Sequence, residues 1–81
     1  MTQFLVLADR DVGEFYLATE PVILLFVGEA GEKVLRPRDE IHFGPGKCGT
    51  VTAADLVLAW LRQSKRIPEA QRAAAEFLRQ S

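Results

Sequence analysis

The spacing of hydrophobic residues changes once along this chain. Residues 1–51 hold short apolar runs separated by acidic or glycine-containing segments, which is typical of strands joined by turns. From Thr52 onward the apolar residues recur at every third or fourth position, which is the period of a helix. The pattern therefore predicts one domain of 81 residues with a β-rich part, 1–51, and a helical part, 52–81.

The β-rich part is expected to form an antiparallel sheet of three to five strands. Phe4–Ala8 and Glu14–Thr19 flank a polar turn and predict a hairpin. The run Val22–Val27 does not alternate with polar residues, which indicates a central strand covered on both faces. Val34–Arg36 can pair back against it, and the alternation of apolar and polar residues over 40–43 predicts a further edge strand.

Two helices are expected after the sheet. Thr52, with Asp55 three positions later, resembles a capping box and predicts a helix from near Ala53 to about Ser64. Pro68 suits the first turn of a second helix. The apolar stripes of the two helices are Ala53, Leu56, Val57, Trp60 and Leu61, then Ala70, Ala74, Phe77 and Leu78. The short link between them predicts a helical hairpin packed on one face of the sheet, an α+β fold.

Charge is divided unevenly between the two ends of the sequence. Up to Glu32 the chain carries six acids and one base, a net charge of −5. From Lys33 onward it carries nine bases and five acids, a net charge of +4. The overall charge of −1 conceals this asymmetry, which points to charged partners rather than to a particular chemistry.

Apolar residues make up 48% of the chain, more than a core of this size readily encloses. Some of them are therefore expected on an outer surface, where a partner or a second copy would cover them. Leu58 lies off the apolar stripe of the first expected helix, among Asp55 and Arg62. We expect Leu58 and one sheet face to form the contact of a homodimer or a partner complex. Ordinary exposure of small apolar side chains is the alternative.

The segment 44–50 contains the string G-x-G-x-x-G but lacks the context of a nucleotide-binding motif. A dinucleotide site needs a strand–helix–strand unit, and here one expected helix follows another. Lys47 precedes Gly49 rather than following it, so the phosphate-loop signature also fails. We interpret the segment as a glycine-rich loop leading from sheet to helix, with anion or phosphate binding through its backbone as an alternative function.

Candidate catalytic and metal-binding residues are few. His42 and Cys48 are single representatives of their types, and a nucleophile pair also needs an orienting group. Asp39 and Glu40 beside His42 and Cys48 do not match the paired Cys and His spacing of structural zinc sites. We therefore expect no enzymatic activity, no cofactor and no metal.

The basic residues suggest nucleic-acid binding as an alternative function. Arg62, Lys65 and Arg66 gather at the end of the first expected helix, and a common positive surface with Arg36, Arg38 and Lys47 is geometrically feasible. The sequence pI of about 5.7 is low for a nucleic-acid-binding domain. Cations are also favoured near a helix C-terminus by the helix dipole alone.

The acidic residues suggest a protein partner. Asp9, Asp11 and Glu14 surround the first expected turn, and Glu29 and Glu32 surround the next, where they can face a basic groove. We expect a small non-enzymatic module that regulates or inhibits a larger protein. Small inhibitors from phages and mobile elements, anti-CRISPR proteins included, offer an analogy of size and character.

The expected location is the cytoplasm. A single cysteine excludes an internal disulfide, and the first residues lack the basic segment of a signal peptide. The longest apolar run is too short to cross a membrane as a helix.

Overall fold

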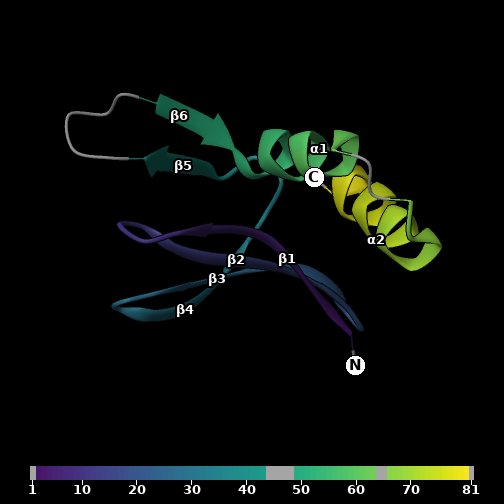
Figure 1. The fold of residues 1–81 in the computed structure, drawn as a ribbon, viewed down its shortest axis with the longest axis horizontal. Helices are drawn as coiled ribbons and strands as arrows, with labels where there is room; N and C mark the ends of the chain where they lie inside the picture. Colours follow the sequence, from purple (N-terminus) through teal and green to yellow (C-terminus); the bar gives the residue numbers. More distant parts are fainter. Residues whose placement is uncertain (1, 44–48, 64–65, 81) are drawn as a thin grey trace.

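A computed structural model of the chain describes residues 2–43, 49–63 and 66–80. Figure 1 shows a four-stranded sheet on one side and, above it, a two-stranded hairpin followed by two helices. The elements are β1 (Gln3–Asp9), β2 (Gly13–Thr19), β3 (Val22–Gly28), β4 (Gly31–Leu35), β5 (Glu40–Phe43), β6 (Gly49–Thr52), α1 (Ala53–Arg62) and α2 (Pro68–Arg79). The predicted α+β fold, an antiparallel sheet followed by a C-terminal helix pair, is confirmed.

The four-stranded sheet is a meander of antiparallel strands in the order β1-β2-β3-β4. Its first turn is closed by Asp9, whose Oδ1 accepts hydrogen bonds from the backbone N–H groups of Asp11 at 2.8 Å and Val12 at 3.1 Å. Gly31 begins β4 with a φ of +116°, a conformation that glycine adopts without steric cost. The turn chemistry read from the sequence therefore produces short hairpins at both positions.

A β-bulge at Val6 interrupts the pairing of β1 with β2. Leu5 pairs with Tyr16 and Leu7 pairs with Phe15, so Val6 is an extra residue on β1. The bulge lets Leu7 lie opposite the buried Phe15 and keeps Leu5 opposite Tyr16 on the other face. Because strand side chains alternate between faces, one inserted residue resets the register of the rest of the strand.

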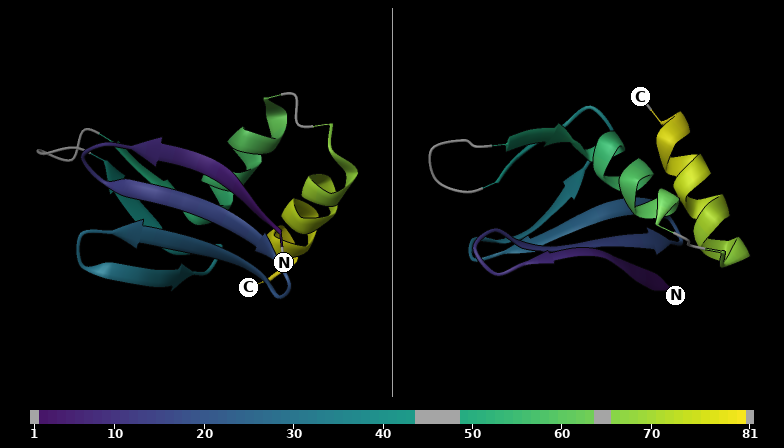
Figure 2. Two further views of the ribbon diagram at one scale, coloured as in Figure 1. Left: turned by 60° about the horizontal axis from the view of Figure 1, so that its bottom comes forward. Right: turned by 45° about the horizontal axis from the view of Figure 1, so that its top comes forward.

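The core lies between the four-stranded sheet and the layer above it. Figure 2 shows the helices beside one another over one end of the sheet, and α2 contacts β2 and β3 while α1 contacts β1 and β6. The predicted helical stripes supply much of the core, with Leu56, Leu61 and Leu78 half-buried at its edge. Its buried members are Phe15, Leu17, Leu24, Leu35, Ile41, Ala53, Val57, Trp60, Ala70, Ala73, Ala74 and Phe77.

The strand expected over 40–43 forms, but it does not join the main sheet. It pairs with Gly49–Thr52 in a separate two-stranded sheet, with Ile41 opposite Val51. The expectation that segment 44–50 is entirely a loop is therefore wrong at Gly49 and Thr50. The reason is the β-branched run Thr50, Val51 and Thr52, which favours extended backbone before the helix begins.

Both helices begin where the sequence predicts. Thr52 is the N-cap of α1, and its Oγ1 accepts a hydrogen bond of 3.1 Å from the backbone N–H of Asp55. Pro68 is the first residue of α2. The first helix ends at Arg62, shorter than expected, and Ser64 lies outside the described residues. Over the described ranges, none of the helices combines the length and apolar character needed to span a bilayer.

Candidate functional site: the outer face of the four-stranded sheet

The helices and the β5–β6 hairpin cover only one face of the four-stranded sheet (Figure 1). We call this the inner face; Phe15, Leu17, Leu24 and Leu35 point from it into the core. Side chains at the alternating positions point to the opposite, outer face. No described element covers that outer face, so the expectation that β3 is covered on both sides is not met within this chain.

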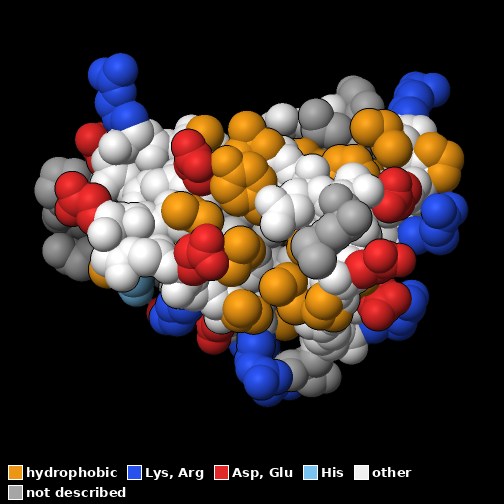
Figure 3. Space-filling model, turned by 90° about the horizontal axis from the view of Figure 1, so that it is seen from below, with side chains coloured by type: hydrophobic (Ala, Val, Ile, Leu, Met, Phe, Trp, Pro, Cys, Tyr) orange, Lys and Arg blue, Asp and Glu red, His pale blue; other side chains and the backbone are white. Residues whose placement is uncertain are grey.

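A row of hydrophobic residues crosses the outer face in register. Tyr16 pairs with Leu5 on one side and with Leu25 on the other, and Leu25 pairs with Val34. We call these four residues the outer row. Leu5 is 51% exposed and Val34 is 53% exposed, although both are large apolar side chains. Figure 3 views this face and shows a band of hydrophobic side chains along it.

Acidic residues border the outer row at one end of the strands. The next row outward contains Glu14 on β2, Val27 on β3 and Glu32 on β4. The turns beyond it carry Asp9, Asp11 and Glu29. A hollow of about 650 Å³ between these turns is lined by Asp9, Arg10, Asp11, Val12, Gly13, Glu14, Val27, Gly28 and Glu29. We call this region, with Glu32, the acidic end.

Tyr16 joins the outer row to the acidic end. Its phenolic oxygen donates a hydrogen bond of 2.7 Å to Oε1 of Glu14. This bond raises the pKa of Tyr16 above its ordinary value, with smaller contributions from desolvation and from the charge of Glu14. The carboxylate is thus held beside the apolar row by a specific contact.

The structure brings together the acidic residues that the sequence singled out around two separate turns. Asp9, Asp11 and Glu14 line one hollow with Glu29, and Glu32 lies in the same row as Glu14. Sequence reasoning did not identify the outer row. Its signal was the unbroken apolar run of β3, whose alternate residues face opposite sides of the sheet.

Leu58 lies apart from this surface. It is half-buried on α1, in the layer that covers the inner face. Leu58 and the outer face therefore do not lie on one continuous surface, and they are separate candidate surfaces.

The basic residues are divided between the two ends of α1. Arg62 and Arg66 are exposed at its C-terminal end. Arg38 lies at its N-terminal end, where it lines a hollow with Thr52 and Arg79, and the neighbouring Pro37 accepts a hydrogen bond of 2.9 Å from the N–H of Ala54. Ten helical residues separate these ends by about 15 Å. Arg36 is exposed after β4, and the predicted members Lys65 and Lys47 lie outside the described residues.

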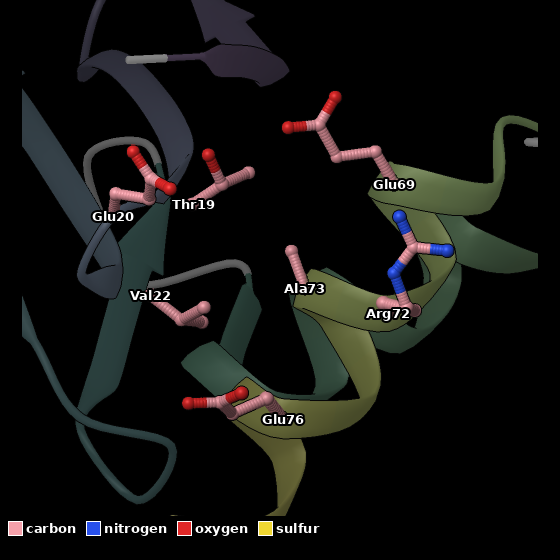
Figure 4. Close-up of a pocket in the computed structure, with 7 residues that line it drawn as sticks. All are labelled: Thr19, Glu20, Val22, Glu69, Arg72, Ala73 and Glu76. Atoms are coloured by element: carbon pink, nitrogen blue, oxygen red, sulfur yellow. The ribbon is translucent and has the colours of Figure 1, made fainter.

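A second hollow lies at the opposite end of the sheet from the acidic end. It measures about 260 Å³ and is lined by Thr19, Glu20, Val22, Glu69, Arg72, Ala73 and Glu76. Figure 4 shows the carboxylates of Glu20, Glu69 and Glu76 around the open space between the β2–β3 turn and α2. With three carboxylates and one guanidinium, this hollow also has an excess of negative charge.

A cavity of about 220 Å³ separates β4 and β5. It is lined by Val12, Phe15, Phe26, Lys33, Leu35, Glu40, Ile41 and His42. His42 is exposed and its Nδ1 lies 3.1 Å from Oγ1 of Thr50, its cross-strand partner. Within the described residues no three potential ligands are grouped to hold a metal ion. Cys48, which the sequence analysis considered with His42 and did not assign to a site, lies outside the described residues, as does most of the glycine-rich loop.

Three comparisons with known proteins give no match. No family model matches the chain, and neither a curated protein nor a solved structure matches it. The functional conclusion therefore depends on the surfaces of the chain itself.

Proposed function

We propose that this protein is a small, non-enzymatic module that binds a larger protein through the outer face of its four-stranded sheet and thereby regulates or inhibits it. The observation that carries the proposal is the outer row. It places an apolar side chain on each of four neighbouring strands, with Leu5 and Val34 half exposed. Contiguous apolar surface of this kind marks interaction sites.

The four-stranded sheet alone is smaller than a typical stable interface. Four strands about 4.8 Å apart, of which three have seven residues of about 3.3 Å rise and β4 has five, give a face of at most about 440 Å². A stable interface buries about 800 Å² on each partner. The contact is therefore expected to continue from the outer row onto the acidic end, which adds polar surface at the rim.

Nucleic acid is the weaker alternative for this surface. Phosphate backbones are bound by clustered Lys and Arg. The described basic residues of the predicted cluster are separated along α1, and the uncovered apolar face is bordered by carboxylates. A protein partner fits both features. The single cysteine favours a partner in a reducing compartment such as the cytoplasm.

The test is affinity capture with the wild-type protein and three variants, from nuclease-treated extract of the source organism. Val34→Glu places a charge in the outer row, whereas Ile67→Glu changes a residue of similar exposure, 50%, at the start of α2. Leu58→Glu tests the surface on α1. We expect a stoichiometric protein to be retained by wild type, Ile67→Glu and Leu58→Glu, and to be lost from Val34→Glu.

Two results would contradict the proposal. Equal capture by wild type and Val34→Glu, or loss with Leu58→Glu alone, would remove the outer face as the binding surface. A parallel capture uses extract without nuclease treatment. Recovery of the protein from that extract alone would replace a protein partner with a nucleic-acid complex.

A further inference from the structure

We infer that the outer face is built for a partner that presents apolar side chains beside a cluster of Lys and Arg. The inference rests on the proposed function, because it names the chemistry of the partner at the same face. Its basis is the distribution of charge around the outer row.

The acidic end carries an excess of negative charge. The hollow between its turns is lined by Asp9, Asp11, Glu14 and Glu29 with Arg10 as its single base. Asp11, Glu14, Glu29 and Glu32 are exposed and Asp9 is half-buried, so a partner can reach them from solvent. A partner surface that lacks basic groups would desolvate part of this charge without compensation, which opposes binding.

The spacing between apolar and acidic rows defines the partner further. Tyr16 and Glu14 are two residues apart on β2, a distance of about 6.8 Å along the strand. Because the Glu14 carboxylate bends back to hydrogen-bond Tyr16, a complementary surface carries its basic groups within about 7 Å of its apolar groups. Residues four apart on a helix, about 6 Å, or two apart on a strand satisfy this spacing.

A second copy of this chain offers the acidic end few basic groups. The hollow at the other end of the sheet has Glu20, Glu69 and Glu76 against the single base Arg72. That hollow lies between the β2–β3 turn and α2, and on the outer face itself Arg36 is exposed two residues beyond Val34. A copy packed face to face would therefore offer the acidic end a single guanidinium from these strands rather than a basic cluster.

The space-filling view agrees with this distribution. Figure 3 shows acidic side chains at both ends of the hydrophobic band, with Lys and Arg side chains toward the periphery. A surface rich in Lys and Arg would pair with these acids.

The experiment uses three synthetic amphipathic peptides of equal length as probes. One combines Leu with Lys, one combines Leu with Glu, and one combines Ser with Lys. Binding to the full chain is measured by fluorescence anisotropy and mapped by amide chemical shifts. We expect the Leu–Lys peptide alone to bind, with shifts on the outer face. Glu32→Lys should weaken it about three- to tenfold, whereas Glu40→Lys, a matched change at an exposed position of β5, should not.

Each other outcome overturns the inference. Equal binding of both Leu peptides would show that charge does not select the partner, while leaving the outer face as a binding surface. Equal binding of the Ser–Lys peptide would reduce the effect to charge alone, and failure of the Leu–Lys peptide to bind the outer face would remove the assigned chemistry. A wild-type dimer through the outer face in sedimentation would make the second copy the occupant. Failure of the proposed function would be recognised by a different result, which is equal protein capture by wild type and Val34→Glu.

Discussion

Tyr16 and Glu14 are two residues apart on β2 and are joined by a hydrogen bond of 2.7 Å between the phenolic oxygen and the carboxylate. Tyr16 belongs to the outer row and Glu14 to the acidic end. The bond fixes the position of a negative charge directly beside hydrophobic surface. The two properties that define the proposed binding face are therefore coupled through one side-chain pair.

The pKa of Tyr16 provides a direct measure of that pair. The hydrogen bond to Glu14 is the largest cause of its increase above the ordinary value of 10.0. Glu14→Gln should therefore lower the pKa of Tyr16 toward the ordinary value, because an amide is a weaker acceptor and carries no charge. Tyr16 is the single tyrosine of the chain, so an ultraviolet absorbance titration reports it alone.

The raised pKa of Tyr16 determines how its contribution to stability changes with pH. Because the folded-state pKa of Tyr16 is raised, its contribution to stability is fully present below the unfolded pKa and is lost as pH rises through the folded pKa. The control for the titration is Glu32→Gln. Glu32 lies in the same cross-strand row as Glu14, but the hydrogen bond described for Tyr16 goes to Glu14. An equal pKa change in both variants would contradict the assignment to Glu14.

Substitutions at Gly13 and Gly31 distinguish backbone strain from steric collision as the cost of adding a side chain. Both have positive φ, at 144° and 116°. A Cβ at Gly13 would collide with the carbonyl oxygen of Val27 and the ring of Phe26, whereas one at Gly31 would meet nothing within 4 Å. Gly31→Ala should cost about 1–3 kcal/mol from backbone strain alone. Gly13→Ala should lower the free energy of unfolding by more than Gly31→Ala does, as measured by urea denaturation. Equal losses of stability in the two variants would contradict the steric explanation.

Phe77 tests how α2 is held on the sheet. Its side chain is fully buried, with 0% exposure, in the core formed with β2 and β3. Phe77→Ala should lower the free energy of unfolding by about 3–5 kcal/mol, because it removes buried apolar surface and leaves a cavity. Leu5→Ala, at a position that is 51% exposed, should change it by less than about 1 kcal/mol. Urea denaturation of both variants checks the difference.

Much of the fold could be predicted because local signals and packing agree. Thr52 begins α1 through its side-chain cap, and Pro68 begins α2, both at the predicted positions. The apolar run of β3 indicated an interior strand, and β3 does lie between β2 and β4. The period of hydrophobic residues fixes which side chains face the core.

The remaining features depend on distant contacts that no local pattern contains. The β-branched residues of Gly49–Thr52 favour extended backbone, but the strand is completed only by pairing with residues 40–43. The acidic end arises because the meander brings the β1–β2 and β3–β4 turns to the same end of the sheet. The uncovered state of the outer face could not be predicted, since β3 has the same apolar sequence whether another layer covers it or not.

The N-cap of α1 should respond to the hydroxyl of residue 52 and not to its size. Thr52→Ala removes the acceptor for the Asp55 N–H and should cost about 1 kcal/mol. Thr52→Ser retains an acceptor and should recover most of that loss. Thermal or urea unfolding of the three proteins measures the difference, and equal destabilisation by Ala and Ser would assign the effect to the lost methyl group instead.

The outer row should bind a neutral hydrophobic dye more strongly than other exposed apolar residues do. Val34→Ser in the outer row and Ile67→Ser at the start of α2 remove side chains of similar exposure, 53% and 50%. Each should leave the free energy of unfolding within about 0.5 kcal/mol of wild type. Dye fluorescence should fall for Val34→Ser, because it interrupts four adjacent apolar side chains, and should change little for Ile67→Ser. Equal decreases would show that the outer row has no special affinity for apolar ligands.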